Sequence, residues 1–149
     1  MIKKIQTNSL EETKQLAQKI GSKIQGKTLI LLNGELGAGK TSFTQGLALG
    51  LEISKHVSSP TFTLMKNYFG RLPLNHIDAY RLEGHPQDLG FEELFDEDSV
   101  TVIEWPLYLM DELPESCLKV NIEIGIGDSR VFEFIANGDV HEALIRDLI

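Results

Sequence analysis

Apolar residues near the start of the chain follow first a helical spacing and then a strand-like one. A helix is predicted over 10–24, because Ser9 opens a Ser-x-x-Glu capping sequence and the apolar positions behind it recur at helical intervals: Leu16, Ala17, Ile20 and Ile24. Residues 28–33 form a short, continuous apolar run, which is typical of a strand buried on both faces of a parallel sheet. A second helix is predicted after residue 39, with Gly50 at its end.

Later apolar runs predict further strands. The runs 74–78 and 100–104 each end in an acidic residue, so each is expected to place a carboxylate at the C-terminal end of a strand. Residues 118–124 alternate between apolar and polar, which predicts a half-exposed strand, and 131–135 is expected to pair with it. A closing helix is expected over 140–149. This order predicts an α/β fold whose mixed, mainly parallel sheet is flanked by helices and carries a C-terminal antiparallel strand pair.

Length and composition fit one domain spanning residues 1–149, with 42% hydrophobic and 24% charged residues. No apolar run is long enough to cross a bilayer and the N-terminal residues lack an apolar signal core, so we expect a cytoplasmic protein. Cys117 is the only cysteine of the sequence, which excludes an internal disulfide and a cysteine-based zinc cluster. The net charge of −8, from 22 acidic and 14 basic residues, argues against a broad contact with a nucleic-acid backbone.

One motif indicates nucleotide chemistry. The sequence Gly-Glu-Leu-Gly-Ala-Gly-Lys-Thr matches the P-loop pattern G-x-x-x-x-G-K-[ST] and lies between the buried strand and the second helix, as that motif requires. Its glycines let successive N–H groups surround phosphate oxygens, Lys40 reaches the β and γ phosphates, and the Thr41 hydroxyl takes one Mg²⁺ position. A P-loop NTPase-like domain that binds ATP and Mg²⁺ is therefore predicted. The predicted nucleotide-binding residues are Gly34, Leu36, Gly37, Ala38, Gly39, Lys40 and Thr41.

Asp78 and Glu104 are the acidic residues that end the two later strands. A P-loop enzyme needs a carboxylate at a neighbouring strand end to hold Mg²⁺, often through water. Both positions qualify, so one is predicted to order the metal and the other to orient the attacking water, and the residues alone do not decide which. The hydroxyl-rich segment 57–63 is either a nucleotide-sensing switch or a turn into an edge strand. His76 has no second ligand-type residue in a suitable pattern, so we expect it to be packed or hydrogen-bonded.

Three further motifs follow the P-loop in order: Ser59-Pro60-Thr61-Phe62-Thr63, His76-Ile77-Asp78-Ala79-Tyr80-Arg81 and Glu104-Trp105-Pro106. Together the four motifs resemble the TsaE family, the small ATPases of bacterial threonylcarbamoyladenosine-tRNA synthesis, over nearly the whole chain. The resemblance implies that Thr41 and Glu104 hold Mg²⁺, and that Asp78 is essential to hydrolysis with Tyr80 and Arg81 close by. It implies a switch-like role for 59–63. The match weakens after Pro106, where Leu107, Tyr108 and Leu109 stand where relatives often carry polar residues.

The resemblance also implies a partner, the heterodimer of two related actin-like-fold subunits that transfers threonylcarbamoyl to adenosine 37 of tRNAs reading ANN codons. We expect the isolated protein to be a slow ATPase whose turnover changes with that partner, and to bind tRNA weakly or not at all. No motif marks the adenine pocket, for which the segment before the first helix and the region near Arg130 are candidates.

Other P-loop functions fit the sequence less well or equally well. A small-molecule kinase needs several arginines, many in a lid, whereas the four here do not cluster: Arg71, Arg81, Arg130 and Arg146. A GTPase would show an Asn-Lys-x-Asp motif, which the sequence lacks. A nucleotide-gated adaptor, in which ATP binding orders a partner surface and hydrolysis is incidental, uses the same residues and stays open.

Overall fold

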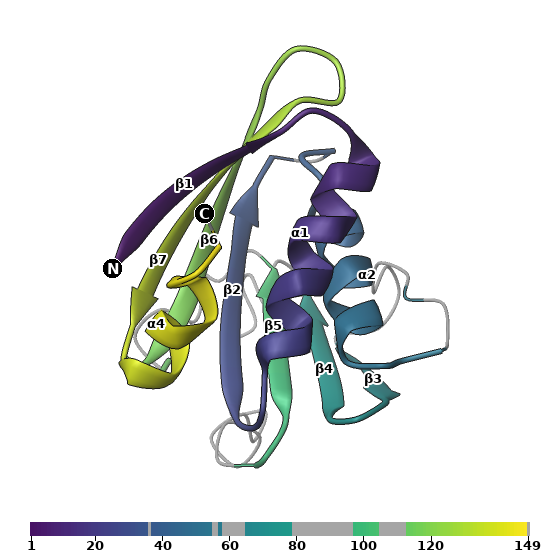
Figure 1. Ribbon diagram of the computed structural model, residues 1–149. Helices are drawn as coiled ribbons and strands as arrows, with labels where there is room; N and C mark the ends of the chain where they lie inside the picture. The colour runs from purple at the N-terminus through teal and green to yellow at the C-terminus, as the bar shows by residue number, and fades with distance from the viewer. Residues whose placement is uncertain (36, 55–56, 58–64, 79–96, 105–112, 149) are drawn as a thin grey trace, which may run out of the picture.

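The computed structural model describes residues 1–35, 37–54, 57, 65–78, 97–104 and 113–148. No helix within these ranges is long and apolar enough to cross a membrane. Strands and helices follow one another as shown in Figure 1. In chain order they are β1 (Ile2–Thr7), α1 (Leu10–Lys23), β2 (Thr28–Gly34), α2 (Lys40–Gly50), β3 (Met65–Phe69), β4 (Pro73–Asp78), β5 (Val100–Glu104), β6 (Cys117–Ile124), β7 (Arg130–Asn137) and α4 (Asp139–Ile145).

All the described strands form one sheet in the order β1-β7-β6-β2-β5-β4-β3. The central strands β6, β2, β5 and β4 run parallel to one another. The pairs at both edges are antiparallel. The predicted mixed α/β fold and its C-terminal antiparallel pair, β6 with β7, are therefore confirmed, with parallel pairing concentrated at the centre. β2 is the middle strand of the sheet. Its first five residues are buried, as expected for a continuous apolar run.

The helices share one hydrophobic core with the sheet. α1 and α2 lie side by side against one face of the sheet (Figure 1). Phe43 of α2 stacks on Phe132 of β7 with ring centroids 5.7 Å apart, and Phe134 lies 6.3 Å from Phe43. Leu144 and Ile145 of α4 join the same core. Full burial of such side chains stabilises the fold by roughly 1.5–3 kcal/mol each, and the aromatic contacts hold the start of α2 against β7.

The helix boundaries follow local chemistry. α1 begins where the capping sequence predicts, and Ser9 Oγ accepts a hydrogen bond from the Glu12 N–H at 3.1 Å. The closing helix is shorter than predicted, because α4 ends at Ile145 and not at 149. The Leu148 N–H donates to Ile145 O at 3.3 Å in a turn that buries Leu148. Burial of this last leucine therefore comes from a turn and does not need a longer helix.

Candidate functional site

The predicted phosphate loop joins the C-terminal end of β2 to the start of α2. Gly37 and Gly39 have φ angles of +82° and +105°, which residues with a side chain rarely adopt. A Cβ at either position would meet nothing within 4 Å, so these glycines are needed for backbone direction and not for space. The Ala38 N–H donates to Glu35 O at 2.9 Å and closes the turn. Consecutive turns of this kind give a concave backbone that suits an anion.

The N-termini of α1 and α2 differ in how their N–H groups are satisfied. In α1, Ser9 caps the helix and Glu11 and Glu12 add negative charge to the first turn. In α2, the N-cap residue Gly39 makes no side-chain cap bond, and no acidic residue lies in the first turn. The first N–H groups of a helix have no partner within the helix. The start of α2 therefore offers donors and the positive dipole end to an anion.

Lys40 lies in the first turn of α2 and is only 7% exposed. Its Nζ donates to Gly34 O at 2.7 Å, across the loop. Burial lowers the pKa of Lys40 below its ordinary value, and the negative charges of Glu104 and Asp78 oppose that shift. The protein therefore holds a desolvated cation between the phosphate loop and two carboxylates.

Glu104 and Asp78 are brought together by the parallel pairing of β5 and β4. They are direct partners in register, and Glu104 is also in register with Leu32 of β2. Side chains at one register position of neighbouring strands point to the same face, and Leu32 packs in the core under α1 and α2. Both predicted carboxylates thus lie on the face of the sheet that carries α2, near Lys40. Glu104 is 4% exposed, whereas Asp78 is half-buried.

His76 is the hydrogen-bonding partner of Glu104. It is fully buried in β4, and its Nε2 lies 2.9 Å from Glu104 Oε2. The prediction that His76 is packed and hydrogen-bonded is confirmed. Because a carboxylate oxygen accepts, we assign the ring proton to Nε2; Nδ1 has no hydrogen-bond partner among the described residues. His76 therefore orients one oxygen of Glu104.

The possible metal ligands at the C-terminal ends of these strands fit Mg²⁺. A threonine hydroxyl and carboxylate oxygens are hard ligands, and Thr41 in the first turn of α2 and Glu104 on the adjacent strand supply them. In the part of the chain that the structure describes, no group of three or more His, Cys, Asp or Glu side chains could hold a metal. A site with only a few protein ligands suits Mg²⁺, which completes its coordination shell with phosphate oxygens and water. The assignment of Thr41 and Glu104 as metal ligands stays a prediction.

Several predicted site residues lie outside the described residues, and their roles stay predictions. They are Leu36 of the loop, most of the 57–63 segment, Tyr80 and Arg81. Trp105 and the 107–109 segment also lie outside the described residues.

Arg130, at the start of β7, contacts the phosphate loop. The sequence pointed to the region near Arg130 only as a candidate adenine pocket and did not predict this contact. Arg130 is 8% exposed, and its guanidinium donates to Ala38 O at 3.0 Å and to Gly37 O at 3.2 Å. In the sequence Arg130 is an arginine after a glycine-containing turn, which does not reveal a contact with residues 92 and 93 positions earlier. Its use for an adenine pocket stays a prediction.

Comparisons with known proteins point to one family. The family model described as threonylcarbamoyl adenosine biosynthesis protein TsaE matches residues 7–131. A tRNA threonylcarbamoyladenosine biosynthesis protein TsaE of Bacillus subtilis is 40% identical over 97% of this chain and 92% of its own length. The protein of that name from Treponema pallidum is 38% identical over 79% of this chain and 89% of its own. A crystal structure of Bacillus subtilis YdiB superposes with a TM-score of 0.84 at 36% identity, covering 99% of this chain and 94% of that one.

Proposed function

Because this chain belongs to the TsaE family of threonylcarbamoyl adenosine biosynthesis proteins, we propose that it is a Mg²⁺-dependent ATPase of this tRNA modification. ATP binding and hydrolysis at the P-loop would act on a partner, the heterodimer of two related actin-like-fold subunits. That complex would transfer threonylcarbamoyl to adenosine 37 of tRNAs that read ANN codons. The family membership supports the pathway, and the site supports the nucleotide chemistry.

Three features meet at the C-terminal ends of the central parallel strands and support nucleotide binding. They are an uncapped helix start behind a positive-φ glycine loop, a buried lysine, and two carboxylates in register. A buried cation next to a helix start that has no side-chain cap favours a ligand with several negative charges. A nucleoside triphosphate meets that requirement, and the absence of an Asn-Lys-x-Asp motif favours ATP over GTP.

Each residue then has a role set by its place. Lys40 neutralises the β and γ phosphates, and the backbone of the loop binds their oxygens. Thr41 and Glu104 would hold Mg²⁺, which when bound offsets charge on the phosphates. Asp78, next to Glu104 and half-buried, orients the attacking water. His76 keeps Glu104 in place from within the sheet.

The proposed dependence on a partner follows from the arginines. Efficient P-loop hydrolases use an arginine at the γ-phosphate, worth ~10³ to 10⁵ in rate. Arg71 and Arg130 both donate to backbone carbonyls; Arg81 lies outside the described residues. We therefore expect slow turnover by the protein alone and a change when the partner is added.

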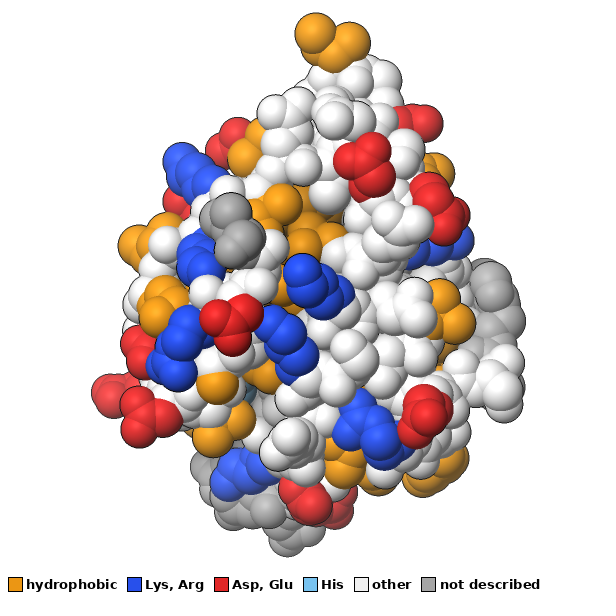
Figure 2. All heavy atoms as spheres, in the orientation of Figure 1, with side chains coloured by type: hydrophobic (Ala, Val, Ile, Leu, Met, Phe, Trp, Pro, Cys, Tyr) orange, Lys and Arg blue, Asp and Glu red, His pale blue; other side chains and the backbone are white. Residues whose placement is uncertain are grey.

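The surface charge supports a partner that carries the RNA. On the face shown in Figure 2, lysine and arginine side chains are interrupted by acidic and hydrophobic ones. The whole chain carries a net charge of −8. Backbone binding to tRNA requires many cationic contacts that act together, so the isolated protein should bind tRNA weakly.

Phosphate release with and without the partner heterodimer, together with threonylcarbamoyladenosine formation on a tRNA, tests the proposal. Asp78→Asn, which keeps shape and removes charge, should bind ATP but lose hydrolysis and tRNA modification together. Modification at the wild-type rate by a variant that binds but does not hydrolyse ATP would instead establish the nucleotide-gated adaptor. Transfer of phosphate to a small-molecule acceptor would establish the kinase.

A further inference from the structure

The guanidinium of Arg130 is surrounded by backbone carbonyl groups from two separate loops. Nε and Nη2 donate to Ala38 O and Gly37 O of the phosphate loop, at 3.0 and 3.2 Å. Nη1 donates to Gly127 O and Ser129 O of the turn between β6 and β7, at 2.8 and 2.7 Å. That turn projects beyond the sheet at the top of Figure 1, at the same end as the phosphate loop. Arg130 therefore joins the loop to a hairpin that follows it by about ninety residues in sequence.

The two bonds to the loop fix the direction of its peptide groups. All described peptide bonds are trans, so the C=O of one residue and the N–H of the next point in opposite directions. With Ala38 O turned toward Arg130, the Gly39 N–H points away from it. An inverted peptide here would present an oxygen where a phosphate needs a donor. Since Gly37 and Gly39 are glycines, the backbone on its own has access to such alternatives.

The positive charge of Arg130 lies next to the phosphate loop and has no carboxylate partner among the described residues. Its four acceptors are uncharged carbonyls, and it forms no ion pair with a carboxylate in the part of the chain that the structure describes. Carbonyl dipoles carry no net charge, so they do not neutralise the guanidinium as a carboxylate would. The positive potential of Arg130, at the start of β7, therefore adds to that of Lys40, in the first turn of α2.

We infer that Arg130 is a positioning residue of the phosphate site, which holds the Gly37 and Ala38 peptide groups in the anion-binding orientation and supplies a second buried positive charge. The inference rests on the proposed ATP binding for its ligand, but its effect on loop conformation can be measured without nucleotide. Lysine at this position keeps the charge but loses the planar fork that reaches several carbonyls at once.

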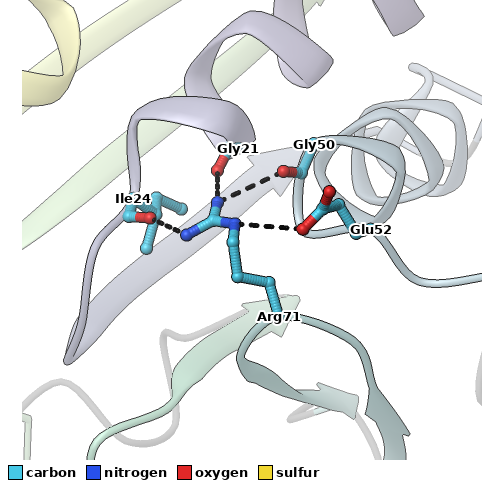
Figure 3. A network of polar contacts seen from close by, with 5 residues as sticks. All are labelled: Gly21, Ile24, Gly50, Glu52 and Arg71. Atoms are coloured by element: carbon cyan, nitrogen blue, oxygen red, sulfur yellow. Dashed lines mark hydrogen bonds and ion pairs between the residues drawn. The ribbon is translucent and has the colours of Figure 1, made fainter.

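Arg71 provides a matched control within the same chain. Figure 3 shows its guanidinium donating to three carbonyls, Ile24 O, Gly21 O and Gly50 O, beside Glu52. These contacts join the C-terminal ends of α1 and α2, away from the helix start that carries the phosphate loop. Arg71→Lys and Arg130→Lys remove the same kind of interaction, so a general loss of stability should appear in both.

The experiment compares wild type, Arg130→Lys and Arg71→Lys by two readouts. The first is the amide NMR shift of Gly39 without nucleotide, and the second is affinity for Mg·ATP by calorimetry. Arg130→Lys should move the Gly39 signal and weaken ATP binding by about tenfold, as loss of charge-assisted bonds that hold a site predicts. Arg71→Lys should lower the melting temperature and leave both readouts as in wild type.

The outcomes separate this inference from the proposed function. An unmoved Gly39 signal in folded Arg130→Lys, or equal losses in both variants, would overturn the positioning role. Wild type that binds no ATP would refute the proposed function, while a moved Gly39 signal would still support the contact. If Arg130→Lys does not fold, the wild-type protein decides. On addition of ATP the Arg130 Nε–H signal should shift and that of Arg71 should not. An Arg130 signal that stays in place while that of Arg71 shifts would contradict the positioning role of Arg130.

Discussion

Replacement of His76 by alanine should weaken both the fold and the use of Mg²⁺. His76 is fully buried, and its Nε2 lies 2.9 Å from an oxygen of Glu104, itself 4% exposed. Removing a buried partner of a charged group costs about 1–3 kcal/mol or more, and the space left by the ring adds to that. We expect His76→Ala to lower the free energy of unfolding by about 3 kcal/mol. His76→Gln, which keeps a donor, should lose less.

Asn75→Ala is the control that separates an effect on Mg²⁺ use from a general loss of stability. Asn75, the neighbour of His76, points to the opposite face of β4, is 4% exposed, and donates through Nδ2 to Ser99 Oγ at 3.1 Å. Asn75→Ala should also lower stability by about 1–3 kcal/mol. Because Asn75 and Glu104 point to opposite faces of the sheet, Asn75→Ala should leave the Mg²⁺ requirement unchanged. His76→Ala should raise that requirement, because Glu104 loses the bond that orients it.

Stability is measured by urea denaturation in metal-free buffer, and the Mg²⁺ requirement by phosphate release at fixed ATP across a Mg²⁺ titration. Two results would contradict the role of His76 in orienting Glu104. One is a wild-type Mg²⁺ curve for folded His76→Ala, which would show that Glu104 needs no support from His76. The other is an equal shift in Asn75→Ala, which would show that both act through general loss of stability.

The metal ligands, His141 and the surface charge can each be tested separately. Thr41→Ala and Glu104→Gln should each raise the Mg²⁺ needed for hydrolysis more than they weaken metal-free ATP binding; a wild-type curve for Glu104→Gln would make Asp78 the metal-side carboxylate. Burial lowers the pKa of His141, whose Nε2 accepts from the Leu29 N–H at 3.0 Å. Its neutral form is therefore favoured in the fold, so stability should fall as pH drops below about 6.5; His141→Gln should flatten that dependence in denaturation measured against pH. Purified protein should show no tight, salt-sensitive tRNA binding in a gel-shift assay.

Local patterns in the sequence predicted the elements that depend on local chemistry. β5 matches its predicted bounds, because a buried parallel strand needs a continuous apolar run. α1 begins after its predicted cap. The edge strand β1 was not predicted, because Ile2 and Ile5 lie three positions apart with two lysines between them and Ile2 is 63% exposed. Such a strand forms through its pairing with β7 and not through its own pattern.

The site divides in the same way. The phosphate loop could be predicted because its chemistry is confined to consecutive residues, Gly34 to Thr41. The bond between His76 and Glu104 depends on the register of two parallel strands, and the contacts of Arg130 depend on where a late hairpin meets the loop. Neither register nor hairpin position follows from residue spacing, because both are set by packing across the whole sheet.

If the P-loop binds Mg·ATP through Lys40, calorimetric titration of wild type and Lys40→Ala with Mg·ATP should show it. Lys40 is 7% exposed and lies beside Glu104 and Asp78, so circular dichroism should first establish that the variant is folded. Wild type should bind with one site per chain, and folded Lys40→Ala should lose most of that affinity because the charge facing the phosphates is gone. Wild-type affinity in Lys40→Ala would contradict the assignment of the site.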